Sequence, residues 1–250
     1  MQLTDDEIRQ ILAEEKRKKR RRMRTRRRVT ALIVLIVLLL LIVLAGSTIS
    51  KKVKSRPKPP AEPLGIIFID PGHGGNDAGA YTDERNEKDD VLKLALAMKT
   101  SLEEKNFKVV MSREDDTDVD TAERNKMAND SNAQLMISLH RNMRESRKGK
   151  GVEAYIPKKD EPESRKLAQN LVNALVEQGF KGRDIVAGTF LDPDKDYDDI
   201  ADVKMPACKL EVGFITNKGD NDLFDNNLNE NAAALAEATY TTFNDLYGSK

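Results

Sequence analysis

From about residue 64 onward, short apolar runs alternate with segments in which apolar side chains recur every three or four residues. The apolar runs predict five β-strands, at residues 66–69, 107–111, 135–139, 152–156 and 207–214. The segments with helical periodicity predict helices at residues 87–104, 121–129, 163–179 and 231–247. Such alternation is typical of an α/β fold. We therefore expect a single domain with a mainly parallel central sheet flanked by helices on both faces.

A different pattern precedes this domain. Residues 29–49 contain no charged side chain, and a helix of that length reaches about 31 Å, close to the hydrocarbon thickness of a bilayer. Eleven Lys and Arg residues lie between Lys16 and Arg28. The positive-inside rule then predicts a basic cytoplasmic leader at residues 1–28, one transmembrane anchor at 29–49, and an extracytoplasmic chain beyond it. Residues 50–63, rich in Pro and Lys, predict an extended spacer before a folded domain at 64–250.

The expected location is therefore the cell membrane, with a single pass and the domain at 64–250 on the extracytoplasmic side. A cleaved signal peptide is the alternative, because Ala45 and Ser47 are small residues at the spacing of a cleavage site. The length of the apolar run and of its basic leader favours a retained anchor.

Charge is balanced over the whole chain, with 42 basic and 42 acidic residues, but it is segregated. The first 58 residues hold 17 basic and five acidic side chains, so the rest of the chain is acidic. An acidic domain is poorly suited to phosphate backbones, which excludes nucleic acid as the expected partner. The single cysteine, Cys208, lies in an apolar run and is expected to be a buried thiol.

The candidate chemistry centres on two histidines and two glutamates. His73 and His140 each follow a predicted strand, and ligands of open α/β sheets bind beyond the carboxyl ends of strands. Glu211 lies inside an apolar strand, and Glu87 lies in the first turn of a predicted helix. Two His and one carboxylate form an open ligand set typical of catalytic zinc. Spacing alone leaves open that the histidines are structural and that Glu87 stabilises the positive end of its helix.

Four local motifs bear on that choice. They are IDPGHGGNDAGA at 69–80, NEKD at 86–89, ISLHRN at 137–142 and MPACKLEVGFITN at 205–217. In sequence and order they resemble the zinc-dependent N-acetylmuramoyl-L-alanine amidases of type 3, which are peptidoglycan hydrolases. The resemblance covers roughly residues 65–247. It implies His73, Glu87 and His140 as Zn²⁺ ligands and Glu211 as general base and acid.

The resemblance also implies substrate-binding candidates. Arg124 and Asn142 line the cleft or tie loops together, and the residues leave both alternatives open. Arg141 stands where the family has a small residue, so we expect it to narrow the cleft or to offer a cation to the substrate. The acidic stretch 192–202 is expected to be a solvated loop, because it lacks the central Gly and terminal Glu of a calcium-binding loop.

The function predicted from the sequence is hydrolysis of the amide between N-acetylmuramic acid and L-alanine in peptidoglycan. Two alternatives are kept. One is a zinc peptidase cutting within the stem peptide, and the other is a non-catalytic wall-binding module. The intact set of His73, Glu87, His140 and Glu211 argues against the module. The sequence indicates no particular protein activator.

Overall fold

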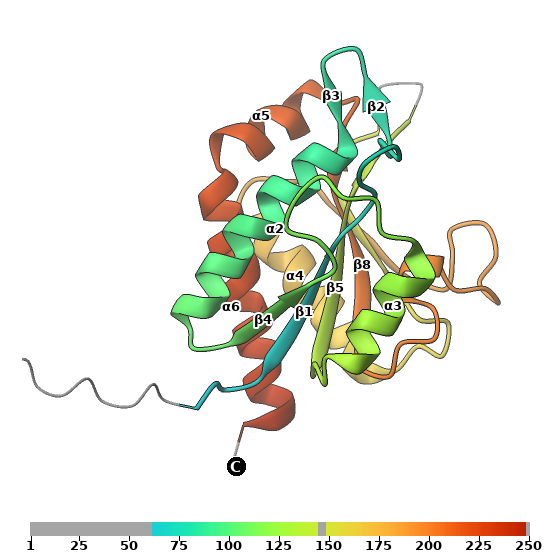
Figure 1. The fold of residues 1–250 in the computed structure, drawn as a ribbon. Coiled ribbons are helices and arrows are strands. Elements are labelled where there is room, and N and C mark those ends of the chain that lie inside the picture. Colours follow the sequence, from blue (N-terminus) through green and yellow to red (C-terminus); the bar gives the residue numbers. More distant parts are fainter. Residues whose placement is uncertain (1–61, 145–148, 249–250) are drawn as a thin grey trace, which may run out of the picture. The chain divides into compact units, whose positions relative to one another are not determined.

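The computed structural model describes residues 62–144 and 149–248, which form an α/β domain with one six-stranded sheet. The strand order is β4-β1-β5-β8-β6-β7 (Figure 1). The strands are β1 (Ile66–Pro71), β4 (Lys108–Met111), β5 (Leu135–Asn142), β6 (Val152–Ile156), β7 (Gly182–Ala187) and β8 (Ala207–Phe214). The helices are α2 (Glu87–Glu104), α3 (Thr121–Asp130), α4 (Pro162–Glu177), α5 (Lys218–Asn226) and α6 (Leu228–Tyr247).

The leader, the predicted anchor at 29–49 and all but the last two residues of the spacer lie outside the described residues. Within the described ranges, no helix is both long and apolar enough to cross a bilayer. The membrane segment therefore stays a prediction.

All five predicted strands and all four predicted helices are present, with ends that differ by a few residues. The main extension is in β5, which continues through Asn142, so that His140 lies within the strand and not after it. The sequence reading missed β7, the short hairpin of β2 (Tyr81–Thr82) and β3 (Arg85–Asn86), the 3₁₀ turn η1 (Asp198–Ile200), and α5. These elements are short, polar or at the edge of the sheet, so their apolar periodicity is weak.

Four of the five strand pairings in the six-stranded sheet are parallel, which confirms the mainly parallel sheet. The exception is β6, which runs antiparallel to β8 and pairs Glu153 with Glu211. As a result, the carboxyl ends of β1, β5 and β8 meet the amino end of β6 at one edge of the sheet. Polar side chains from four strands can therefore gather at this edge.

The two faces of the sheet are covered differently (Figure 1). Helices α2, α4 and α6 pack on one face, where they share a large apolar core with Ile67, Ile137 and Leu210. Helix α3 and η1 lie on the other face, over a smaller cluster that includes Phe68, Met136 and Ile200. Because successive strand residues point to opposite faces, the odd-numbered residues of β5 from Leu135 to Leu139 enter the large core. The even-numbered residues of β5 face α3.

Candidate metal centre

The loop after β1 brings His73 over the end of β5. His73 has a φ of 62°, in the left-handed region that residues other than glycine seldom adopt. Gly72 makes the approach possible, because a Cβ there would lie 2.2 Å from Cε1 of His140. The rings of His73 and His140 consequently meet edge to face, with centroids 5.0 Å apart.

Glu87, at the start of α2, lies between the two imidazoles. Its Oε2 is 3.4 Å from His73 Nε2, and its Oε1 is 2.9 Å from His140 Nδ1. One donor atom from each of the three residues lies within 4.8 Å of the others. Ligands bound at 2.0–2.1 Å to a tetrahedral ion are separated by about 3.3 Å, so these distances fit a metal ion of that size. Backbone N–H groups of Ala80 and Arg141 also donate to the Glu87 carboxylate and fix its orientation.

The remaining nitrogen of each imidazole faces an aspartate. His73 Nδ1 lies 2.6 Å from Asp77 Oδ2, and His140 Nε2 lies 3.3 Å from Asp199 Oδ1. In metal sites the imidazole nitrogen that does not bind the metal usually donates to a carboxylate or carbonyl. The pattern leaves His73 Nε2 and His140 Nδ1 as the atoms directed at Glu87.

Glu211 lies on β8 beside His140, its partner in the strand register. Its carboxylate is buried, and Oε2 makes no hydrogen bond among the described residues. Burial raises the pKa of Glu211 above its ordinary value, while Lys209, with Nζ 3.8 Å from Oε1, opposes that increase. A carboxyl group with a raised pKa beside three convergent donors is suited to proton transfer.

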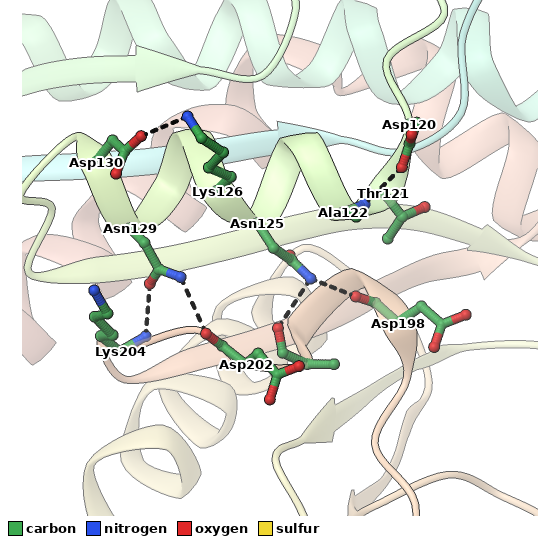
Figure 2. A pocket seen from close by; sticks show the side chains of 11 residues that line it. Asp120, Thr121, Ala122, Asn125, Lys126, Asn129, Asp130, Asp198, Asp202 and Lys204 are labelled. Atoms are coloured by element: carbon green, nitrogen blue, oxygen red, sulfur yellow. Dashed lines mark hydrogen bonds and ion pairs between the residues drawn. The ribbon is translucent and has the colours of Figure 1, made fainter.

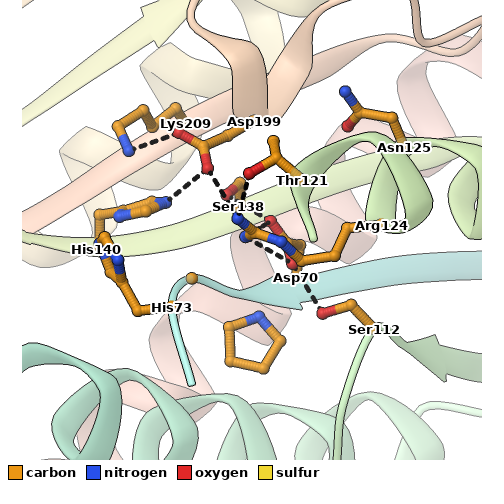
Figure 3. A network of polar contacts seen from close by, with 12 residues as sticks. Asp70, His73, Ser112, Thr121, Arg124, Asn125, Ser138, His140, Asp199 and Lys209 are labelled. Atoms are coloured by element: carbon orange, nitrogen blue, oxygen red, sulfur yellow. Dashed lines mark hydrogen bonds and ion pairs between the residues drawn. The ribbon is translucent and has the colours of Figure 1, made fainter. Parts of the chain in front are cut away.

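A network of buried ion pairs lies next to this group on the α3 face of the sheet (Figure 3). Lys209 Nζ contacts Asp199 Oδ2 at 2.8 Å, and Arg124 donates to Asp70 at 2.9 Å. Ser112 and Ser138 donate to the same Asp70. Arg124 therefore ties α3 to β1. For Arg124, the structure favours the structural alternative over a place in the cleft.

The sequence reading did not select Asp70, Asp199 or Lys209. Asp70 and Lys209 could both have been found from charged positions within apolar strands. Lys209 lies two residues before Glu211 and so on the same face of its strand, and Asp70 lies in the strand that precedes His73. Asp199 carried no such signal. It is one of six aspartates in the stretch 192–202, and only the fold selects it.

Asn142 fits its structural alternative, whereas Arg141 does not lie where it was expected. Asn142 donates to Glu153 Oε1 at 2.7 Å, a glutamate that also accepts from Tyr155 and Arg183. Arg141 is 2 % exposed and points to the opposite face from His140. The expectation that Arg141 lines the cleft is wrong in this structure, because adjacent strand residues point to opposite faces.

The guanidinium of Arg141 is occupied by the protein itself. It donates to Asp90 Oδ2 and to Asn221 Oδ1, each at 2.6 Å, and it lies 4.3 Å from the centroid of the Phe224 ring. Arg141 thereby links β5 to α2 and α5.

The acidic stretch 192–202 borders a pocket of about 590 Å³ between α3 and the segment after η1 (Figure 2). Asn125 Nδ2 donates to the carbonyls of Asp198 and Ala201, and Asn129 Nδ2 donates to that of Asp202. Asp194 and Asp198 are exposed, as expected for a solvated loop. Asp199 is the exception, because it turns inward to Lys209 and His140. In the described ranges, His73, Glu87 and His140 form the one acidic or His cluster able to hold a metal ion.

Cys208 lies on the opposite face of β8 from Lys209, inside the large core. It is fully buried, and burial raises the pKa of its thiol to about 12. The prediction of a buried thiol is confirmed, and a thiol with this pKa is no nucleophile at neutral pH.

An α/β sheet with an open His–Glu–His group and a buried carboxylate at its strand ends is suited to metal-assisted hydrolysis. Comparison with known families identifies the kind of enzyme. Residues 67–242 match the family model described as N-acetylmuramoyl-L-alanine amidase, and the chain belongs to this family. It is accordingly a cell-wall hydrolase with N-acetylmuramoyl-L-alanine amidase activity.

Individual relatives agree. The germination-specific N-acetylmuramoyl-L-alanine amidase of Bacillus subtilis is 32% identical over 182 residues, which cover 65% of this chain and 73% of the relative. The amidase LytC of the same organism is 33% identical over 175 residues, 69% of this chain but 34% of the relative. The crystal structure of an N-acetylmuramoyl-L-alanine amidase from Clostridium difficile 630 superposes with a TM-score of 0.66 at 28% identity, covering 72% of this chain and 97% of the other.

Proposed function

We propose that the enzyme cleaves the amide between N-acetylmuramic acid and L-alanine with one zinc ion held by His73, Glu87 and His140, and with Glu211 as general base and acid. The observation that carries the proposal is the convergence of three donor atoms, all within 4.8 Å of one another, beside a buried carboxylate. Two imidazoles and one carboxylate form a ligand set typical of catalytic zinc. When bound, zinc supplies Lewis acidity toward water and toward the amide carbonyl.

The role of Glu211 follows from its position. In its ionised form it accepts a proton from the attacking water, and it then returns that proton to the departing amine of L-alanine. Lys209 stabilises the ionised form, while burial raises the pKa so that the proton can also be held and passed on. Glu153, held by Asn142 and Arg183, borders Glu211 on β6 and keeps the adjacent part of the sheet polar.

The direct test is mass spectrometry of muropeptides after incubation of the zinc-supplemented enzyme with purified peptidoglycan, beside Glu211→Gln. We expect stem peptides with a free N-terminal L-alanine, unbroken glycan chains, and a rate about 10²- to 10⁴-fold lower in the variant. New ends further along the stem peptide would instead show a peptidase. A folded, zinc-loaded enzyme that gives no new ends would support the wall-binding module.

We also propose that the enzyme acts from the membrane, anchored by residues 29–49 with its N-terminus in the cytoplasm. The support is the uncharged run of bilayer length and the basic residues that precede it. Membrane fractionation followed by N-terminal sequencing tests the anchor. A membrane-associated chain that retains its leader supports the proposal, whereas a mature chain beginning after Ser47 would show a cleaved signal peptide.

A further inference from the structure

The imidazole of His140 has a different partner on each side. Nδ1 lies 2.9 Å from Glu87 Oε1, on the side where the three donor atoms converge. Nε2 is buried and makes no hydrogen bond within the described residues, and the carboxylate facing it is Asp199, with Oδ1 at 3.3 Å. A buried ring N–H without an acceptor would be costly, so the nature of this neighbour matters.

Asp199 is held firmly, although it comes from the acidic loop. Lys209 Nζ lies 2.8 Å from its Oδ2, and Arg124 Nη2 lies 3.4 Å from its Oδ1. The 3₁₀ turn that carries Asp199 is attached to α3, because the Asn125 amide donates to the carbonyls of Asp198 and Ala201. Figure 3 shows Asp199 between Lys209, Arg124 and His140.

We propose that Asp199 is a positioning residue of the metal centre. A small rotation of the ring or of the carboxylate lets Asp199 accept the Nε2–H of His140 across the present 3.3 Å separation. That bond fixes the tautomer in which the lone pair of Nδ1 faces Glu87 and is available to a metal ion. Lys209 and Arg124 hold the carboxylate in place. The inference rests on the proposed metal centre, and it deepens that proposal by assigning a role that neither the motifs nor the comparisons give to Asp199.

The test is the zinc affinity of the purified full chain, measured by competition with a chromogenic chelator. Loss of an orienting carboxylate usually weakens metal binding about 10- to 100-fold, and we expect that loss for Asp199→Ala. Asp199→Asn is expected to lose less, because its amide oxygen can accept the same hydrogen bond. Asp198→Ala is the matched control. It removes an exposed carboxylate from the same 3₁₀ turn, and its affinity is expected to equal that of the wild type.

A second variant addresses folding. Asp199→Ala leaves Lys209 without its nearest carboxylate in a buried position, which alone can destabilise the domain. The double variant D199V/K209M removes both charges together. A folded double variant that still binds zinc about 10- to 100-fold more weakly supports the role of Asp199 toward His140. Recovery of wild-type affinity in the double variant would overturn it, since the loss would then come from the unpaired Lys209.

A spectroscopic measurement gives a readout that a merely structural role would not move. In ¹H–¹⁵N spectra of the zinc-loaded chain that detect the ring nitrogens, we expect His140 to carry its proton on Nε2, and we expect that signal to be lost or exchange-broadened in Asp199→Ala. A proton on Nδ1 would overturn the inference. Failure of the wild type to bind zinc would instead refute the metal centre itself, so the two failures are distinguishable.

Discussion

Single residues of this enzyme take their roles from the alternation of side chains along the strands. On β5, His140 faces the proposed metal centre, and its neighbour Arg141 faces the helices on the other side of the sheet. On β8, Lys209 and Glu211 share the face of His140, whereas Cys208 and Leu210 enter the core. A residue next to a catalytic one in the sequence therefore lies on the far side of the sheet in the fold.

For Arg141 this placement predicts a loss of stability and not of substrate binding. Burial lowers the pKa of Arg141 to about 10, so it is still a cation at neutral pH, and Arg141→Met leaves Asp90 with one cationic partner fewer. We expect the free energy of unfolding, measured in urea, to fall by about 3–5 kcal/mol, with KM unchanged for the molecules that remain folded. Lys126→Met, which removes an exposed pair with Asp130, is the control and should cost under about 1 kcal/mol. A raised KM in an Arg141→Met variant of unchanged stability would instead show that Arg141 contacts the substrate.

The position of Lys209 beside Glu211 predicts that its substitution changes the pH dependence of activity. In the proposed mechanism activity requires ionised Glu211, so activity falls as the pH drops through the pKa of that group. Because burial raises this pKa, we expect the acid limb of kcat/KM to lie above the ordinary glutamate value of about 4.3. Lys209 opposes the increase in the pKa of Glu211, and Lys209→Met should therefore move the acid limb to higher pH. An unchanged limb in a folded variant would show that another group controls it.

At the scale of elements, the segment from β1 to α2 positions two of the three proposed ligands. His73 lies in its first loop, and Glu87 is the first residue of α2. Gly79 has a φ of 65°, and a Cβ there would lie 2.6 Å from His73 Cδ2 and 2.7 Å from Glu87 Oε2. Gly79→Ala should thus displace two proposed ligands at once. We expect weaker zinc binding together with lower activity, measured by chelator competition and by muropeptide release.

A control for that variant is available in the same domain. Gly179 also has a positive φ, of 99°, but a Cβ there would meet no atom closer than 3.3 Å, from Leu223, and it lies in the turn between α4 and β7. Gly179→Ala also carries backbone strain but touches no proposed ligand, so it should lose stability and keep its zinc affinity. Equal zinc affinities in the two variants would refute the local role of Gly79.

The strength of the periodic signal decided which elements could be predicted. The regular apolar positions of α2 and α4 become buried residues, and both helices were found within a few residues of their ends. In β7, with the sequence GRDIVA, charged residues occupy the first half of an edge strand, and the pattern gave no prediction. The antiparallel direction of β6 could not be predicted from the sequence either. Strand direction depends on how the chain returns to the sheet, and the residue pattern of a five-residue strand is the same in both directions.

For the whole molecule, the basic leader, the apolar run and the Pro-rich spacer predict an enzyme confined to wall near the membrane. Deletion of residues 51–60 should shorten its reach. We expect cleavage of the wall in cells to decrease, with the activity of the purified protein on soluble muropeptides unchanged. Replacement of the same residues by a Gly/Ser linker of equal length is the control for length against composition. Unaltered cleavage in cells after the deletion would show that the length of the spacer does not limit the reach of the enzyme.

The sequence by itself determined the class of fold and the family, and it selected the two histidines and the two glutamates that the fold brings together. Those features are local, since the periodicity of strands and helices and the glycine-rich turn before α2 depend on residues that are consecutive in the chain. Only the tertiary structure decided the partners of these residues. Asp199 is one of several aspartates in a polar loop, and it becomes a neighbour of His140 because η1 folds back over β5 and β8. Arg141 appeared to belong to the site in the linear sequence, but the sheet separates it from His140, because burial and pairing are properties of the assembled layers.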